Sequence, residues 1–234
     1  MVEEYSDLTI LIPTLNEVDN IGKILQVLNS KYKKAKIIVI DDGSSDSTKS
    51  VVSNFSKKHA NVMLFDRSRE RVHGLAISIM EGALKVHTKK IVVIDADMQH
   101  PPSKVRELYR KLDHFDIVVG VRSKVENWGI ARMLVSKSVA YLAYFIFKLR
   151  GKYTCNDMMS GFFGIKADLF KSTVLNNWGS YVHTGYKVLL DTLRIAGPGL
   201  KIGEVQYSTF HKRSAGKSKV GFRVALNVVE SILR

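Results

Sequence analysis

The chain has 234 residues, 45% of them hydrophobic, and a formal net charge of +14. This composition is typical of a globular protein and excludes a disordered or fibrous one. The single cysteine, Cys155, excludes a disulfide scaffold and a cysteine-based zinc site. No apolar run reaches the roughly 18 residues that span a bilayer, and no secretory signal peptide is expected. The charge is the one abnormal quantity, and it predicts an anionic partner: nucleic acid, a membrane surface or a phosphorylated substrate.

Short apolar runs alternate with helical patterns along the first half of the chain. Strands are predicted at residues 8–12, 36–40, 62–65, 90–94 and 116–119. Helices are predicted at residues 18–28, 45–55 and 74–86, and after the Pro101-Pro102-Ser103 turn. Because the runs are continuously apolar, we expect an α/β fold with a mostly parallel sheet that helices cover on both faces. Ligands of such sheets bind at the carboxyl ends of the strands.

The second half of the chain is less regular. The pattern predicts a long apolar helix near residues 130–149, a strand near 162–165, a helix near 181–195, a strand near 202–210 and a final helix. No internal repeat or low-complexity linker divides the chain, so a single domain over residues 1–234 is expected.

Two carboxylates follow the fourth predicted strand directly. Asp95 and Asp97 are one residue apart where the chain leaves the sheet, so both can turn toward one cation, and Gln99 can add an amide oxygen. Oxygen ligands without cysteine suit Mg²⁺ or Mn²⁺, which commonly also bind substrate phosphates. For His100, which Pro101 follows, a structural or solvent-facing role is favoured over metal ligation.

Two further turns at strand ends carry hydrogen-bond acceptors. One of Asp41 and Asp42 is expected to serve only the turn and the cap of the next helix, which leaves the other to bind a base or a ribose. The turn from Pro13 to Glu17 offers a similar acceptor. The chain contains neither a P-loop motif nor a G-x-G-x-x-G fingerprint. A bound nucleotide would therefore be held by a metal ion and basic side chains rather than by a glycine cradle.

The motifs taken in order resemble the family 2 glycosyltransferases with the GT-A fold, and within them the dolichyl-phosphate mannose synthase group. The resemblance covers essentially the whole chain and rests on Pro13-Thr14-Leu15-Asn16-Glu17, Asp41-Asp42-Gly43-Ser44-Ser45-Asp46, Gly74-Leu75-Ala76, Asp95-Ala96-Asp97-Met98-Gln99-His100-Pro101-Pro102, Arg122, Trp128, Arg132, Ser136, Asp157, Ser160-Gly161-Phe162, Phe210, Arg213, Gly216, Ser218 and Lys219. One departure is Ala76-Ile77-Ser78, where relatives often have a second small or glycine residue.

The resemblance implies a Rossmann-like nucleotide-diphospho-sugar transferase domain and a role for each matched position. The nucleotide sugar would be bound by Pro13, Leu15, Glu17, Ile40, Asp42, Asp95, Ala96, Asp97, Gln99, Arg122, Arg213 and Lys219. The metal would be held by Asp95, Asp97 and Gln99. The acceptor phosphate would be bound by Arg122, Arg132, Ser136 and Arg213. The residues implied as catalytic are Asp97, Arg122 and Arg213.

The implied reaction is the transfer of mannose from GDP-mannose to dolichyl or another polyprenyl phosphate, with Mg²⁺ or Mn²⁺ as cofactor. A lipid phosphate is already anionic, so no general base is expected, and attack opposite the leaving group would give a β-linked product. The alternatives are a UDP-glucose-dependent transferase acting on the same lipid, an enzyme with a soluble hydroxyl acceptor and a carboxylate base near Asp157 or Asp191, and a non-catalytic binding protein.

The basic residues are concentrated in two stretches. Residues 120–153 contain seven Lys or Arg against one Glu, and residues 200–234 contain seven against two Glu. Helices predicted at about 129–150 and 219–234 place apolar and aromatic side chains beside these charges, which is typical of helices that lie in a membrane interface. Packing of both helices on the sheet or in a dimer is the alternative. We expect peripheral attachment to the cytoplasmic face of a membrane and no nucleic-acid partner.

Overall fold

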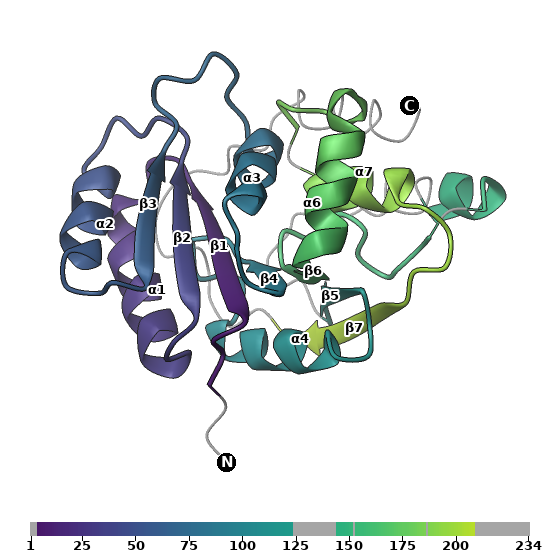
Figure 1. Ribbon diagram of the computed structural model, residues 1–234, viewed down its shortest axis with the longest axis horizontal. Helices are drawn as coiled ribbons and strands as arrows, with labels where there is room; N and C mark the ends of the chain where they lie inside the picture. Colours follow the sequence, from purple (N-terminus) through teal and green to yellow (C-terminus); the bar gives the residue numbers. More distant parts are fainter. Residues whose placement is uncertain (1–3, 124–143, 152, 186, 209–234) are drawn as a thin grey trace.

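The computed structural model describes residues 4–123, 144–151, 153–185 and 187–208 (Figure 1). The strands are β1 (Leu8–Thr14), β2 (Lys36–Asp41), β3 (Val62–Asp66), β4 (Lys90–Val93), β5 (Ile117–Arg122), β6 (Phe163–Lys166) and β7 (Ile202–Tyr207). The helices are α1 (Val18–Lys31), α2 (Thr48–Ser56), α3 (Leu75–Leu84), α4 (Val105–Lys111), α6 (Ala167–Asn176) and α7 (Val188–Ile195). Two short 3₁₀ helices, η1 (Pro102–Lys104) and η2 (Trp178–Ser180), precede α4 and follow α6. Residues 144–149 are also helical.

The strands form one seven-stranded sheet in the order β3-β2-β1-β4-β6-β5-β7. Strand β6 pairs antiparallel with both β4 and β5, while all other neighbours are parallel. The mostly parallel α/β fold expected from the sequence is therefore confirmed. The carboxyl ends of the parallel strands and the segment that enters β6 consequently meet at one edge of the sheet.

Side chains that alternate along the strands build two separate cores. On β1, Ile10 and Ile12 pack into the core that α1, α2 and α4 cover, while Leu11 packs into the core on the opposite face. Helices α3, α6 and α7 cover that second face (Figure 1). Burial on both faces is the physical reason for the continuous apolarity of these strands.

The expected helix near residues 181–195 is shorter than its sequence pattern, because only α7 forms. Residues 181–185, called here the capping segment, instead pack against the start of α3. The backbone N–H groups of Ala76 and Ile77 donate to the carbonyl oxygens of Gly185 and His183 at 3.0 and 3.2 Å. These donors lie in the first turn of α3 and have no partner within the helix, so the capping segment satisfies them from outside. Helix α6 was not expected from the sequence.

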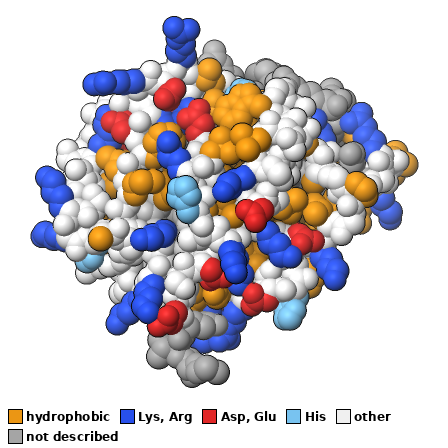
Figure 2. Space-filling view, in the orientation of Figure 1, with side chains coloured by type: hydrophobic (Ala, Val, Ile, Leu, Met, Phe, Trp, Pro, Cys, Tyr) orange, Lys and Arg blue, Asp and Glu red, His pale blue; other side chains and the backbone are white. Residues whose placement is uncertain are grey.

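The predicted long helix near residues 130–149 lies mostly outside the described residues, as does the final helix. Within residues 144–149, Phe147 is fully buried whereas Tyr144, Phe145 and Leu149 are exposed. No helix of the described part of the chain is long and apolar enough to cross a membrane. On the face shown in Figure 2, Lys and Arg side chains are interspersed with Asp and Glu rather than gathered into one block.

Candidate active site

The turn after β4 lies at the point where the order of the strands reverses. From β1 the sheet continues through β2 and β3 on one side, whereas β4 lies on the other side of β1. Crevices at such switch points are the usual ligand sites of α/β sheets. The side chain of Asp95 is 36% exposed, whereas Asp97 is buried. The Oδ1 of Asp97 accepts a hydrogen bond of 3.0 Å from the backbone N–H of Gln99. Met98, which lies between Asp97 and Gln99, has a left-handed backbone conformation with φ of 61°. The tight turn therefore brings both carboxylates to the edge of the sheet.

His100 fixes the orientation of Asp95. Its Nε2 lies 2.9 Å from Asp95 Oδ2 and its Nδ1 lies 2.7 Å from the hydroxyl oxygen of Tyr207 at the end of β7. The imidazole is buried and stacks on Phe162, with ring centroids 5.3 Å apart. The expected structural role of His100 is thus what the structure shows, but the residue does not face solvent. A histidine that holds a carboxylate in this way leaves the other oxygen, Oδ1, to a ligand.

Gly161 provides the space in which Asp95 lies. A Cβ atom at this position would be 3.0 Å from Asp95 Oδ2 and 3.3 Å from Oδ1. The neighbouring Ser160 anchors the same turn, because its hydroxyl donates to the carbonyl oxygen of Gly120 at 2.8 Å. The Ser160-Gly161 pair therefore shapes the site from the segment that enters β6.

Two cations lie near the carboxylates. Arg122, at the end of β5, has its Nε 3.4 Å from Asp157 Oδ2. Lys187, just before α7, donates from Nζ to the carbonyl oxygen of Met159 at 2.7 Å. Burial lowers the pKa of Lys187, and the charge of Arg122 adds to this effect, while Asp157 and Asp95 oppose it.

The same charges act on Asp95. Burial alone would raise the pKa of Asp95, but the hydrogen bond and charge of His100 act in the opposite direction. The positive charges of Lys187 and Arg122 add to this effect, so the pKa of Asp95 lies below its usual value. The carboxylate is therefore ionised at neutral pH.

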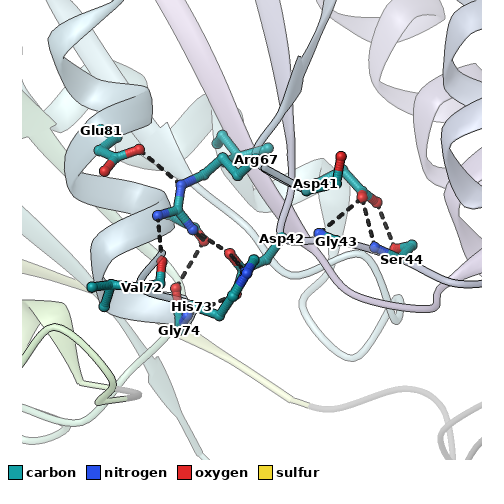
Figure 3. Close-up of polar contacts among 12 residues, drawn as sticks. Asp41, Asp42, Gly43, Ser44, Arg67, Val72, His73, Gly74 and Glu81 are labelled. Atoms are coloured by element: carbon teal, nitrogen blue, oxygen red, sulfur yellow. Dashed lines mark hydrogen bonds and ion pairs between the residues drawn. The ribbon is translucent and has the colours of Figure 1, made fainter. Parts of the chain in front are cut away.

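The adjacent carboxylates after β2 have different surroundings (Figure 3). Asp41 is fully buried and accepts hydrogen bonds from the backbone N–H groups of Gly43 and Ser44 at 3.2 and 2.8 Å, so it is the turn-forming member of the pair. Asp42 points the other way, toward the buried guanidinium of Arg67 and the backbone of Gly74. One carboxylate of the pair thus builds the turn, as the sequence led us to expect, while the other lies at the sheet edge.

The turn after β1 is tied to this second turn. Asn16, with φ of 55°, accepts a hydrogen bond of 2.8 Å on its Oδ1 from the backbone N–H of Ser45. Its own backbone N–H donates to the hydroxyl of Ser44 at 2.8 Å. The two turns therefore form one connected wall of the crevice.

The structure gathers most of the described residues proposed from the sequence at this edge. Pro13 and Ile40 are buried opposite each other in β1 and β2, and Ala96 is also buried. Leu15 is 39% exposed at the rim, and Glu17 precedes α1 and accepts a hydrogen bond from Asn20 at 3.0 Å. Four proposed residues lie outside the described part of the chain: Arg132, Ser136, Arg213 and Lys219.

Sequence reasoning missed Arg67 and Lys187. Arg67 follows β3 in a stretch rich in charged residues, and nothing in its sequence surroundings distinguishes it from Arg69 or Arg71. Lys187 follows the capping segment, which reads as helix in the sequence. The positions of both depend on tertiary packing that no local pattern carries.

The turn from Asp95 to Gln99, called here the carboxylate turn, has oxygen ligands that fit a divalent cation. Asp95 and Asp97 offer carboxylate oxygens and Gln99 an amide oxygen, which are the ligands that Mg²⁺ and Mn²⁺ prefer. Within the described residues, no three His, Cys, Asp or Glu side chains are grouped so that they could hold a metal ion by themselves. A cation here would therefore take part of its coordination from water or from a bound phosphate.

The mostly parallel sheet with an acidic turn at its carboxyl edge fits the GT-A fold that the sequence motifs imply. The chain belongs to glycosyl transferase family 2, whose model matches residues 9–173. The family expected from the sequence motifs is thus confirmed, and the protein is an enzyme of the glycosyltransferase class.

Several curated relatives match almost the whole chain. A dolichol-phosphate mannosyltransferase from Pyrococcus furiosus is 30% identical over 97% of this chain, which spans 62% of that relative's length. A dolichol-phosphate mannosyltransferase from Saccharomyces cerevisiae is 27% identical over 98% of this chain and 85% of its own. An undecaprenyl-phosphate mannosyltransferase from Micrococcus luteus is 26% identical over 96% of this chain and 91% of its own.

Solved structures support the fold. Glucosyl-3-phosphoglycerate synthase from Mycobacterium tuberculosis, in complex with phosphoglyceric acid, superimposes with a TM-score of 0.69 over 97% of this chain and 78% of its own, at 17% identity. The same enzyme with Mn²⁺, uridine diphosphate and glucosyl-3-phosphoglycerate also gives a TM-score of 0.69, at 18% identity. At this identity the likeness shows the shared fold.

Proposed function

We propose that the chain transfers mannose from GDP-mannose to dolichyl or another polyprenyl phosphate, with inversion to a β-linked product. The observation that carries this proposal is the match of 96–98% of the chain to relatives named for mannose transfer to a polyprenyl phosphate. The carboxylate turn and Arg122 supply the chemistry that such a transfer needs at one edge of the sheet. UDP-glucose as donor to the same lipid is the alternative, since the structural neighbour was crystallised with uridine diphosphate.

Asp95, Asp97 and Gln99 would hold Mg²⁺ or Mn²⁺. The structural neighbour was crystallised with either metal, which supports the use of a divalent cation here. The chemistry that a cation held there would supply is stabilisation of the negative charge on the departing nucleoside diphosphate. His100 and Gly161 keep Asp95 in place for this task.

Arg122 and Lys187 would reduce the repulsion between a diphosphate donor and a phosphate acceptor. Both lie beside the carboxylate turn, and both are only partly exposed, so solvent screens their charges less than at an open surface. The acceptor phosphate is already anionic and needs no base, so Asp157, the carboxylate beside Arg122, has the role of orienting that arginine. Catalysis would then rest on positioning and electrostatics.

The acceptor side remains a set of predictions. Arg132, Ser136 and Arg213 would bind the acceptor phosphate, and Arg213 and Lys219 the donor. All four residues lie outside the described part of the chain, as do most residues of the interface helices proposed at about 129–150 and 219–234. A single domain over residues 1–234 is also part of this proposal.

Peripheral attachment to the cytoplasmic face of a membrane is part of the same proposal. On the described part of the first interface helix, Phe147 is buried in the core, while Phe145 and Leu149 are 59% and 72% exposed beside Lys148. An anchored helix that presents apolar and basic side chains outward suits a membrane interface.

The proposal is tested with radiolabelled GDP-mannose and UDP-glucose, each with Mg²⁺ or Mn²⁺ and a polyprenyl phosphate in detergent. We expect a mannosyl lipid from GDP-mannose alone. Transfer from UDP-glucose alone would select the alternative donor, and transfer only to a soluble acceptor such as 3-phosphoglycerate would refute the lipid substrate.

Matched variants test the carboxylate turn in the same assay. Asp97→Ala should abolish transfer and leave the far-ultraviolet circular dichroism unchanged, because Asp97 lies in the turn after β4 and belongs to no helix or strand. The exposed Asp168 at the start of α6 provides the control, and Asp168→Ala should keep full activity. Near-normal turnover by Asp97→Ala would remove the metal from the mechanism.

A further inference from the structure

Arg67 is a fully buried guanidinium next to the proposed donor site. It follows β3 directly, has no exposed side-chain surface, and lies beneath the turn that carries Asp42 (Figure 3). Burial of an unpaired guanidinium is very costly, so its partners show what the position requires. Arg67 donates from Nε to Glu81 Oε2 at 2.8 Å, from Nη2 to the carbonyl oxygen of Val72 at 2.9 Å, and from Nη1 to Asp42 Oδ1.

Asp42 is held from three directions. Arg67 contacts its Oδ1 from the protein interior, and Nδ1 of His73 lies 3.1 Å from the same oxygen on the solvent side. The backbone N–H of Gly74 donates to Oδ2 at 2.7 Å. An ionised carboxylate can only accept, so the imidazole Nδ1 donates, and about four acceptor positions exist in all. The side chain of Asp42 is 9% exposed, whereas that of His73 is 46% exposed.

The three contacts leave little freedom to the carboxylate. Rotation about the Cβ–Cγ bond would break a charge-assisted bond on each side, and such bonds are the strong ones. Oδ1 is occupied twice, so the acceptor position that remains for a ligand is on Oδ2. A ligand N–H or O–H therefore meets an oriented acceptor rather than a rotating one.

We propose that Arg67 and His73 are positioning residues that hold the Asp42 carboxylate toward the nucleoside of the donor and thereby set the affinity for a nucleoside diphosphate. The inference rests on the proposed function, because Asp42 is placed at the nucleoside only by that proposal. Arg67 fixes Asp42 from the interior, and His73 completes the arrangement at the surface. Preorganisation of this kind raises affinity by removing the cost of ordering the acceptor on binding.

The first test separates the nucleoside from the phosphates. GDP, UDP and inorganic pyrophosphate are titrated by calorimetry into the full chain with Mn²⁺, since pyrophosphate lacks the part that Asp42 would contact. We expect His73→Ala to weaken binding of the preferred nucleoside diphosphate about three- to tenfold, the effect of one ordinary hydrogen bond from a half-exposed side chain, and to leave pyrophosphate binding unchanged. His73→Asn should restore much of the affinity, because its amide nitrogen can donate to Asp42 from nearly the same place.

A second pair of variants tests the buried side. Arg67→Lys keeps the charge but loses the fork that contacts Asp42 and Val72 together, so nucleotide affinity should fall about tenfold or more while pyrophosphate again serves as reference. Arg69→Lys is the matched control, because it makes the same exchange at an exposed position two residues further along the chain. It should keep wild-type affinity for both ligands.

Each outcome decides the inference. Wild-type nucleotide affinity in folded His73→Ala would overturn it, and because His73 is half-exposed this variant should fold even if Arg67→Lys does not. Equal loss of nucleotide and pyrophosphate binding would also overturn it, since it would show general damage to the site. A wild-type chain that binds GDP or UDP but transfers no sugar would refute the proposed function and leave the variants to decide this inference, whereas one that binds neither nucleotide would refute both.

Discussion

The bridge that His100 forms between Asp95 and Tyr207 allows a sharp prediction. His100→Phe keeps a buried ring that can stack on Phe162, but it removes the contacts of 2.9 Å to Asp95 and 2.7 Å to Tyr207. Tyr207 is 3% exposed, so its hydroxyl loses a partner that water cannot easily replace. Loss of both contacts should lower the free energy of unfolding by about 2–4 kcal/mol.

The same substitution should weaken metal binding more than stability alone would require. Asp95 would keep its charge but lose the hydrogen bond that orients it, and loss of such a supporting partner typically costs about 10–100-fold in metal affinity. Urea denaturation measures the first effect, and titration of the folded protein with Mn²⁺, followed by electron paramagnetic resonance, measures the second. His100→Gln should be intermediate in both, because its amide can satisfy one of the two partners.

The control is His114→Phe, the same exchange at an exposed position after α4, which should leave both quantities unchanged. A folded His100→Phe protein that binds Mn²⁺ with wild-type affinity would refute the reasoning, because Asp95 would then not depend on His100 for its orientation.

Three further predictions concern the frame around the site. Gly74→Ala should lower stability by about 2–3 kcal/mol in urea denaturation, because the new Cβ would lie 2.7 Å from a backbone carbonyl oxygen; an unchanged midpoint would contradict this close approach. Burial raises the pKa of Asp116, but its hydrogen bonds with Lys166 and Lys201 outweigh this effect, so its pKa in the folded state lies below the usual value. Its stabilising effect is present above the unfolded pKa of about 4 and is lost as the pH falls through the folded pKa. Asp116→Asn should therefore lower the free energy of unfolding by about 1–2 kcal/mol at pH 7 and by progressively less as the pH falls below about 4. An equal loss at pH 7 and in this acidic range would argue against an ionised native carboxylate. Burial raises the pKa of the Cys155 thiol to about 12, so iodoacetamide should label the folded chain at least about tenfold more slowly than the unfolded chain, and equal rates would show that the thiol is accessible.

The strands and the carboxylate turn could be predicted because their signals are local. Four consecutive apolar residues before Asp95 indicate a buried strand, and the position of Asp95 and Asp97 at its end follows from the parallel fold. The sequence also predicted that one of Asp41 and Asp42 would form the turn and that the other would lie at the sheet edge, but it did not indicate which, since a turn needs only one carboxylate.

The contacts that orient these carboxylates could not be predicted. Arg67 reaches Asp42 because β2 and β3 are neighbours in the sheet and because Ser78 and Glu81 of α3 also bind its guanidinium. The pattern from Tyr181 onward reads as helix, yet the carbonyl groups of His183 and Gly185 accept from the first N–H groups of α3, which lack partners within the helix. The N–H groups that need these acceptors belong to a helix about a hundred residues earlier in the chain, so the local sequence pattern does not indicate the contact.

The place of β6 between β4 and β5 has a consequence for the synthesis of the chain. Strands β4 and β5 follow each other along the sequence, but they pair with β6 rather than with each other. Until residues 163–166 have left the ribosome, both strands present unpaired backbone edges, and such edges promote association between nascent chains. Native hydrogen exchange should therefore show β4, β5 and β6 losing protection together, as expected of one cooperative unit that forms only after most of the chain has been made.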